Sequence, residues 1–236
     1  MRSRTIFCIF GLLLMFAYTI HTVAADVNIV IDGNFDDWAD VPVIIQDPDD
    51  VFEDNGDIKE IRVHSTDNTL YIMLTVYGTA APADDQRYYY HTLIDADNSI
   101  NTGFSNAEYE GNATGVQNPI GADFYVQVGR RSGADDGIEV YFLTPDSGDT
   151  VAEGFSWAAG GDSMEIAVPF AMFNALQDIG DIFVVGQTIM VAAFQEGNAN
   201  DWEVDWTESA EHVIGVPTAV EPTGKLPIKW ATLKQI

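Results

Sequence analysis

A loop near the middle of the chain gathers the side chains best suited to bind a metal ion. Residues 95–103 read Asp-Ala-Asp-Asn-Ser-Ile-Asn-Thr-Gly and follow an apolar run directly, and Asp123 begins a later strand that could reach this loop. Carboxylates and amides are hard oxygen donors, and Ca²⁺ takes about six to eight such ligands. A polar turn without a metal is the alternative interpretation. We predict a structural calcium site whose ligands are Asp95, Asp97, Asn98, Asn101 and Asp123.

A second acidic loop precedes the first by about forty positions along the chain. Residues 47–57 carry six carboxylates in eleven positions. Crowded carboxylates repel one another unless a cation or water relieves the charge. A run of this composition favours a solvated surface loop, which is the interpretation adopted for it.

Aromatic side chains among acids and amides are candidates for sugar binding. A sugar site needs aromatic faces on a loop or a concave sheet, with polar groups at the rim that bond hydroxyls. Trp202 and Trp206 lie four positions apart in an acid- and amide-rich stretch, so in a strand they point to the same side. One of this pair could instead belong to the core. The predicted carbohydrate-binding residues are Trp157, Trp202, Trp206 and Tyr89.

The elements that must position these residues are short strands. After residue 26, short alternating apolar runs are broken by Gly, Asn, Asp and Pro, which is typical of an all-β sandwich or barrel. A short helix is expected after Pro169, because proline is tolerated in a first helical turn. A sandwich of about nine strands is expected, and the candidate strands lie at 27–31, 58–66, 70–77, 88–94, 122–128, 138–143, 155–158, 164–168, 190–195 and 203–206.

Five short motifs, in order, resemble those of family 9 carbohydrate-binding modules and the DOMON-like β-sandwich superfamily. The resemblance spans about residues 27–210, and its motifs lie at 31–38 (IDGNFDDW), 70–76 (LYIMLTV), 93–103, 121–125 (GADFY) and 164–169 (MEIAVP). It implies a two-sheet antiparallel β-sandwich that acts as a non-catalytic binding module. In resembling modules two tryptophans sandwich a sugar, which matches this chain by residue type only. Some relatives bind haem, which makes a haem-binding electron-transfer domain an alternative.

The beginning of the chain has the three parts of a signal peptide. Arg2 and Arg4 precede an apolar run at 6–20, and small residues end at Ala25, so cleavage is expected before Asp26. The prediction divides the chain into a signal peptide (1–25), a binding domain (26–216), and a linker with a basic tail (217–236). A secreted or cell-surface protein follows from this prediction, and no other stretch is apolar enough to cross a membrane.

The net charge of the chain and the absence of catalytic motifs disfavour several classes of function. The formal net charge of −27 disfavours nucleic acids and anionic lipids as partners. The sequence has no nucleophile elbow, HExxH or P-loop motif, so no catalytic residue is predicted. Haem, judged unlikely, would need an axial pair such as His64 and Met73. The favoured function is glycan binding with structural calcium, and a surface or structural interaction protein is a further alternative.

Overall fold

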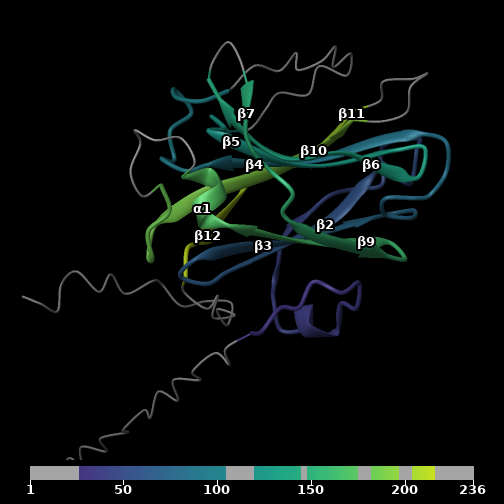
Figure 1. Ribbon diagram of the computed structural model, residues 1–236, viewed down its shortest axis with the longest axis horizontal. Helices are drawn as coiled ribbons and strands as arrows, with labels where there is room; N and C mark the ends of the chain where they lie inside the picture. Colours follow the sequence, from purple (N-terminus) through teal and green to yellow (C-terminus); the bar gives the residue numbers. More distant parts are fainter. Residues whose placement is uncertain (1–26, 105–119, 145–147, 175–181, 197–203, 216–236) are drawn as a thin grey trace, which may run out of the picture.

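Two antiparallel sheets face each other in the computed structural model of the chain (Figure 1). The structure describes residues 27–104, 120–144, 148–174, 182–196 and 204–215. The five-stranded sheet has the order β1 (Val43–Gln46), β2 (Ile58–Ser65), β3 (Thr69–Val76), β9 (Ser163–Pro169) and β8 (Ser156–Gly160). The seven-stranded sheet has the order β11 (Val204–Trp206), β10 (Thr188–Glu196), β4 (Arg87–Asp95), β5 (Phe124–Arg131), β6 (Ala134–Leu143) and β7 (Gly148–Glu153), and β12 (Ala210–Val213) pairs with β10. The predicted two-sheet antiparallel β-sandwich is confirmed.

The strand predictions were wrong in two respects. The described residues contain twelve strands rather than about nine, because the short strands β1, β7 and β12 were not expected. The predicted strand at 27–31 is irregular backbone that pairs with neither sheet. Its apolar alternation instead buries Ile29 in a small cluster with Trp38, Val41 and Met73. The segments 1–25 and 217–236 lie outside the described residues.

The main core fills the space between the sheets. Alternate strand residues point to the same side, so Leu70, Ile72, Leu74 and Val76 of β3 all point inward and are 0 % exposed. Strand β4 is buried on both of its faces, because a second apolar cluster covers the outer side of the seven-stranded sheet. This outer cluster includes Leu93, Tyr125, Leu143, Ala192, Phe194 and Trp206.

The N-terminal segment lies against the outer side of the five-stranded sheet, as the purple ribbon of Figure 1 shows. Glu165 of β9 is fully buried and holds this segment. It accepts hydrogen bonds from the backbone N–H groups of Asp32 and Gly33, both at 2.7 Å, and from Trp38 Nε1 at 2.9 Å. Gly33 has a φ of +81°, a backbone conformation that glycine adopts without steric cost. Trp38 is therefore a structural anchor.

The described helices are short. The 3-10 helix η1 covers Asp36–Trp38, and α1 covers Phe170–Phe173 directly after Pro169, where the sequence predicted a helix. Phe170 and Phe173 are buried and attach α1 to the core. Within the described ranges, no helix has the length and apolar character needed to cross a membrane.

Candidate functional site

A polar pocket of about 450 Å³ opens on the outer side of the seven-stranded sheet. We call it the outer pocket. Strands β4, β5, β6 and β10 lie side by side there, and their outward residues form its wall. Three tyrosines contribute aromatic surface, and one amide and three carboxylates contribute polar groups. These seven residues are Tyr89, Tyr125, Tyr141, Gln127, Asp136, Glu139 and Glu196.

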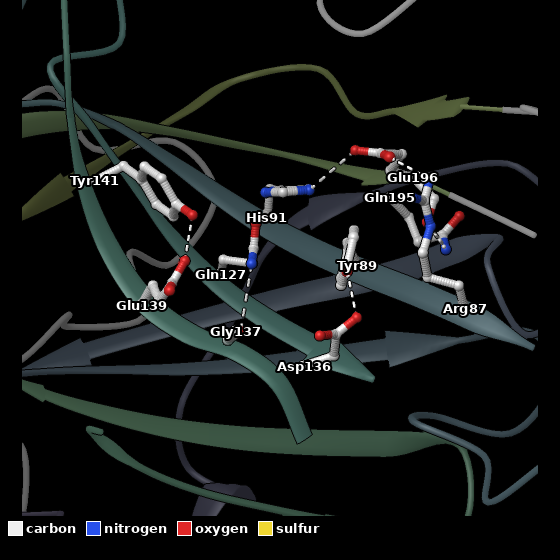
Figure 2. A network of polar contacts seen from close by, with 10 residues as sticks. All are labelled: Arg87, Tyr89, His91, Gln127, Asp136, Gly137, Glu139, Tyr141, Gln195 and Glu196. Atoms are coloured by element: carbon white, nitrogen blue, oxygen red, sulfur yellow. Dashed lines mark hydrogen bonds and ion pairs between the residues drawn. The ribbon is translucent and has the colours of Figure 1, made fainter. Parts of the chain in front are cut away.

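Hydrogen bonds hold several side chains of the outer pocket in place (Figure 2). The Tyr89 hydroxyl donates to Asp136 Oδ2 at 2.5 Å, and the Tyr141 hydroxyl donates to Glu139. Gln127 Nε2 donates to the carbonyl of Gly137 at 3.4 Å. Burial, together with the bond to Asp136, raises the pKa of Tyr89 to about 12, so its phenol stays a donor at neutral pH.

A buried charge pair forms one end of the outer pocket. Glu196 is 2 % exposed, and its Oε1 lies 2.6 Å from Arg87 Nη2. His91 Nε2 is 3.7 Å from Glu196 Oε2 (Figure 2), and burial lowers the pKa of His91, so its imidazole is neutral near pH 7. Arg87 also lies 4.9 Å from the centroid of the Tyr89 ring. Arg87 therefore neutralises Glu196 and braces the nearest tyrosine.

A continuous row of rings supports the outer pocket from β11 across to β6. Trp206 stacks on Phe194 with 4.5 Å between the ring centroids, and Phe194 stacks on His91 with 4.1 Å between the centroids. His91 meets Tyr125 edge-on at 5.0 Å, and Tyr125 lies 4.3 Å from Tyr141. Offset and edge-on ring pairs add to the energy of apolar burial. We call these five rings the aromatic row.

The structure brings together only part of the predicted sugar site. Tyr89 lines the outer pocket, and Trp206 supports it from the aromatic row, although only 7 % of Trp206 is exposed. Trp157 lies on β8 of the other sheet, packed against the main core, with the Arg130 guanidinium 5.3 Å from its ring. The pocket does not include Trp157. Trp202 lies outside the described residues.

The sequence reasoning missed most residues of the outer pocket. Gln127 of β5 pairs with Glu139 of β6, and Tyr125 pairs with Tyr141, so four polar or aromatic side chains share one face. The signal was present in the sequence. In both strands these residues alternate with the inward-facing valines Val126 and Val140.

Three of the predicted calcium ligands come together. Ligand oxygens of Asp95, Asp97 and Asp123 all lie within 4.8 Å of one another. Ca²⁺ binds oxygens at about 2.3–2.6 Å, so two ligands on opposite sides of one ion are about 5 Å apart. Burial raises the pKa of Asp95 and of Asp123, a cost that a bound cation would offset. The carboxylate set therefore fits Ca²⁺, and Asn98 and Asn101 are exposed members of the same loop.

Close backbone packing brings this loop to Asp123. Phe104 and Ala122 exchange backbone hydrogen bonds at 2.7 and 3.0 Å. A Cβ atom on Gly121 would lie 2.4 Å from the carbonyl oxygen of Ser99, so only glycine allows this approach. Asp123 Oδ2 accepts from the Ala96 N–H at 2.9 Å, which fixes the direction of its carboxylate.

The three histidines within the described ranges, His64, His91 and His212, already have neighbours. His91 belongs to the aromatic row, and His212 Nε2 is 2.8 Å from the Ser65 hydroxyl. His64 and Met73 lie on the paired strands β2 and β3, as predicted, and Met73 packs in the small cluster with Trp38. These positions give no particular support to an axial His–Met pair.

Comparisons with known proteins identify no family for this chain. No family model matches it, and no curated protein matches it. One similar solved structure is described as a "putative carbohydrate-binding protein" from Bacteroides uniformis ATCC 8492. The two chains share 11 % identity with a TM-score of 0.39, over 75 % of this chain and 79 % of that one. A similarity this weak gives no evidence about the function of this chain.

Proposed function

We propose that this protein is a non-catalytic carbohydrate-binding module and that the outer pocket is its binding site. The observation that carries the proposal is one pocket of about 450 Å³ lined by Tyr89, Tyr125 and Tyr141 together with an amide and three carboxylates. A sugar ring presents an apolar face, which suits aromatic surface, and hydroxyl edges, which suit amide and carboxylate groups. The volume lies within the range of about 300–1,000 Å³ that is usual for small-molecule sites.

The carboxylates of the outer pocket are better suited to binding than to catalysis. Glycoside hydrolysis uses one carboxyl group as an acid and a second as a base or nucleophile. Here Asp136 accepts from Tyr89, Glu139 accepts from Tyr141, and Glu196 is paired with Arg87. Each carboxylate is thus fixed as an acceptor, so we expect sugars to be bound without release of reducing ends.

The proposal includes a structural calcium ion held by Asp95, Asp97 and Asp123, with Asn98 and Asn101 beside it, and secretion directed by residues 1–25. Calcium should raise the melting temperature, because a ligand that binds only the folded state stabilises that state. The double variant Asp95→Ala/Asp97→Ala should lose the part of this rise that the Asp95 loop supplies. A melt of the wild-type protein that chelator leaves unchanged would contradict the calcium site.

A glycan array followed by affinity electrophoresis tests the sugar proposal. Glu139→Gln keeps the size of a side chain that lines the outer pocket and removes its charge, so glycan binding should weaken at least about tenfold. Glu153→Gln is the matched control, since Glu153 pairs with Glu139 across β6 and β7 but is exposed. A broad array without any binding would remove the proposal, and a Soret band in the purified protein would favour haem instead.

A further inference from the structure

A second group of carboxylates converges at the opposite side of the seven-stranded sheet from the outer pocket. Ligand oxygens of Asp47, Asp50 and Asp205 all lie within 4.8 Å of one another. Asp47 follows β1, whereas Asp205 lies on β11, far away along the chain. The interpretation of residues 47–57 as a solvated loop is wrong for Asp47 and Asp57, which are 9 % and 0 % exposed.

Asp57, whose charge acts on both Asp47 and Asp205, gives an independent sign that a ligand is needed here. Its side chain is fully buried, and among the described residues its Oδ1 has no hydrogen-bond partner. Its Oδ2 accepts from the Val51 N–H at 3.1 Å, which belongs to the same loop. A buried carboxylate oxygen left unpaired costs more than an ordinary lost hydrogen bond, so it calls for a specific partner.

The four carboxylates also act on one another electrostatically. Burial, followed by the charges of neighbouring aspartates, raises the pKa of Asp47 to about 7, of Asp57 to about 6 and of Asp205 to about 7. None of the ion pairs found among the described residues involves these four side chains. Lys59 instead lies over the ring of Tyr77, at 5.7 Å from its centroid.

We propose that Asp47, Asp50 and Asp205 bind a calcium ion at a site separate from the Asp95 loop, with the buried Asp57 carboxylate beside them. The site is largely prearranged: Asp205 Oδ2 accepts from the Ile58 N–H at 2.6 Å, and the Asp47 N–H donates to the Lys59 carbonyl at 3.0 Å. Calcium suits it better than magnesium, because Ca²⁺ accepts irregular sets of oxygens whereas Mg²⁺ demands a near-octahedral shell and keeps its waters. The ion would fasten the 47–57 loop and the start of β2 to β11.

Calorimetric titration of the metal-stripped full chain with CaCl₂ tests the site. Asp50 is exposed, so Asp50→Asn should leave folding intact while weakening one calcium-binding event at least tenfold. Asp49→Asn removes the same charge from the neighbouring exposed residue and should stay within twofold of the wild type. Asp97→Asn should weaken a different event, which separates this site from the Asp95 loop. Wild-type affinities in Asp50→Asn, or equal affinity for MgCl₂, would overturn the proposal.

Melting temperatures supply a second test, in which the variants should be more stable than the wild type in chelator but should gain less stability from calcium. In chelator, Asp50→Asn and Asp57→Asn should each raise the melting temperature, because each removes one charge from a crowded group. In calcium, both variants should gain less than the wild type, because Asp50→Asn removes one ligand and Asp57→Asn removes a negative charge beside the ion. If the gain on adding calcium is unchanged in both variants, these carboxylates do not hold the ion.

Discussion

Replacement of Glu165 by glutamine should release the N-terminal segment from the five-stranded sheet. One oxygen, Oε1, accepts from the N–H groups of Asp32 and Gly33, and the other, Oε2, accepts from Trp38 Nε1. A glutamine amide has one oxygen and one NH₂ group, so in either orientation it turns a donor toward a donor. With the NH₂ group facing Trp38, whose side chain is buried, an unpaired indole N–H costs about 1–3 kcal/mol. The hydrogen bonds from the Asp32 and Gly33 N–H groups remain but lose their charged acceptor, which costs about 1 kcal/mol for each bond.

Glu165→Gln should therefore lower the free energy of unfolding by about 3–5 kcal/mol. Urea titration followed by tryptophan fluorescence measures this loss. A double-mutant cycle with Trp38→Phe checks the cause, because Phe removes the indole N–H and should be about 1–2 kcal/mol less costly in the Gln background. A total loss below about 1 kcal/mol, or two strictly additive substitutions, would refute this account of Glu165.

Three further predictions concern the pH dependence of stability, the packing of the Asp95 loop, and the coupling between calcium binding and glycan binding. Burial and nearby His64 lower the pKa of His212 to about 4, whereas an unfolded histidine takes up its proton near pH 6.5. The free energy of unfolding should therefore fall by up to about 3 kcal/mol between pH 6.5 and pH 4. Urea titrations of His212→Gln should show a smaller fall over this range. A fall as large as that of the wild type would contradict the role of His212. Gly121→Ala should reduce the calcium-induced rise in melting temperature, since its Cβ would collide with the Ser99 carbonyl; an unchanged rise would argue against that packing. Calcium should tighten glycan binding measured by calorimetry, and Asp50→Asn should abolish this effect; equal glycan affinity with and without calcium would disprove the coupling.

The sequence predicted best those features that depend on neighbours along the chain. Alternating residues predicted β2, β3 and β9, because each has one face against the main core. The sequence could also predict that Asp123 lies close to the Asp95 loop, because neighbouring strands place them there. The loop begins at Asp95, the last residue of β4, and Asp123 directly precedes β5, which pairs with β4. Adjacent strands bring the ends of consecutive segments together without further information.

Features that depend on distant partners could not be predicted in this way. The 47–57 loop has the composition of a solvated segment, and distant strands bury part of it: Asp205 of β11 approaches Asp47, and the Tyr90 hydroxyl of β4 donates to the Asn55 carbonyl. The contribution of β4 to the outer pocket could not be predicted, because β4 is buried on both faces and shows no polar alternation, unlike β5 and β6. The segment at 27–31 alternates as a strand would, yet its apolar side packs on Trp38 instead of joining a sheet.

The contacts of Glu165 explain why two of the sequence motifs occur together. The motif at 31–38 supplies the three N–H donors, and the motif at 164–169 supplies the carboxylate that accepts them. Neither motif is stable alone, because a buried carboxylate without donors and a buried indole N–H without an acceptor are both costly. Their joint presence therefore indicates a fold, and it carries no information about a ligand.

The short strand β11 connects the proposed second calcium site with the outer pocket. Its consecutive residues point to opposite sides of the sheet: Asp205 points inward and accepts from the Ile58 N–H, whereas Trp206 points outward and stacks on Phe194. An ion that holds Asp205 in place would also hold Trp206, and through it the aromatic row beneath the outer pocket. Coupling between two binding sites is reciprocal, so a glycan bound in the outer pocket should raise calcium affinity by the same factor that calcium raises glycan affinity. The antiparallel pairing of β10 with β11 over three residue pairs is the physical path for that coupling.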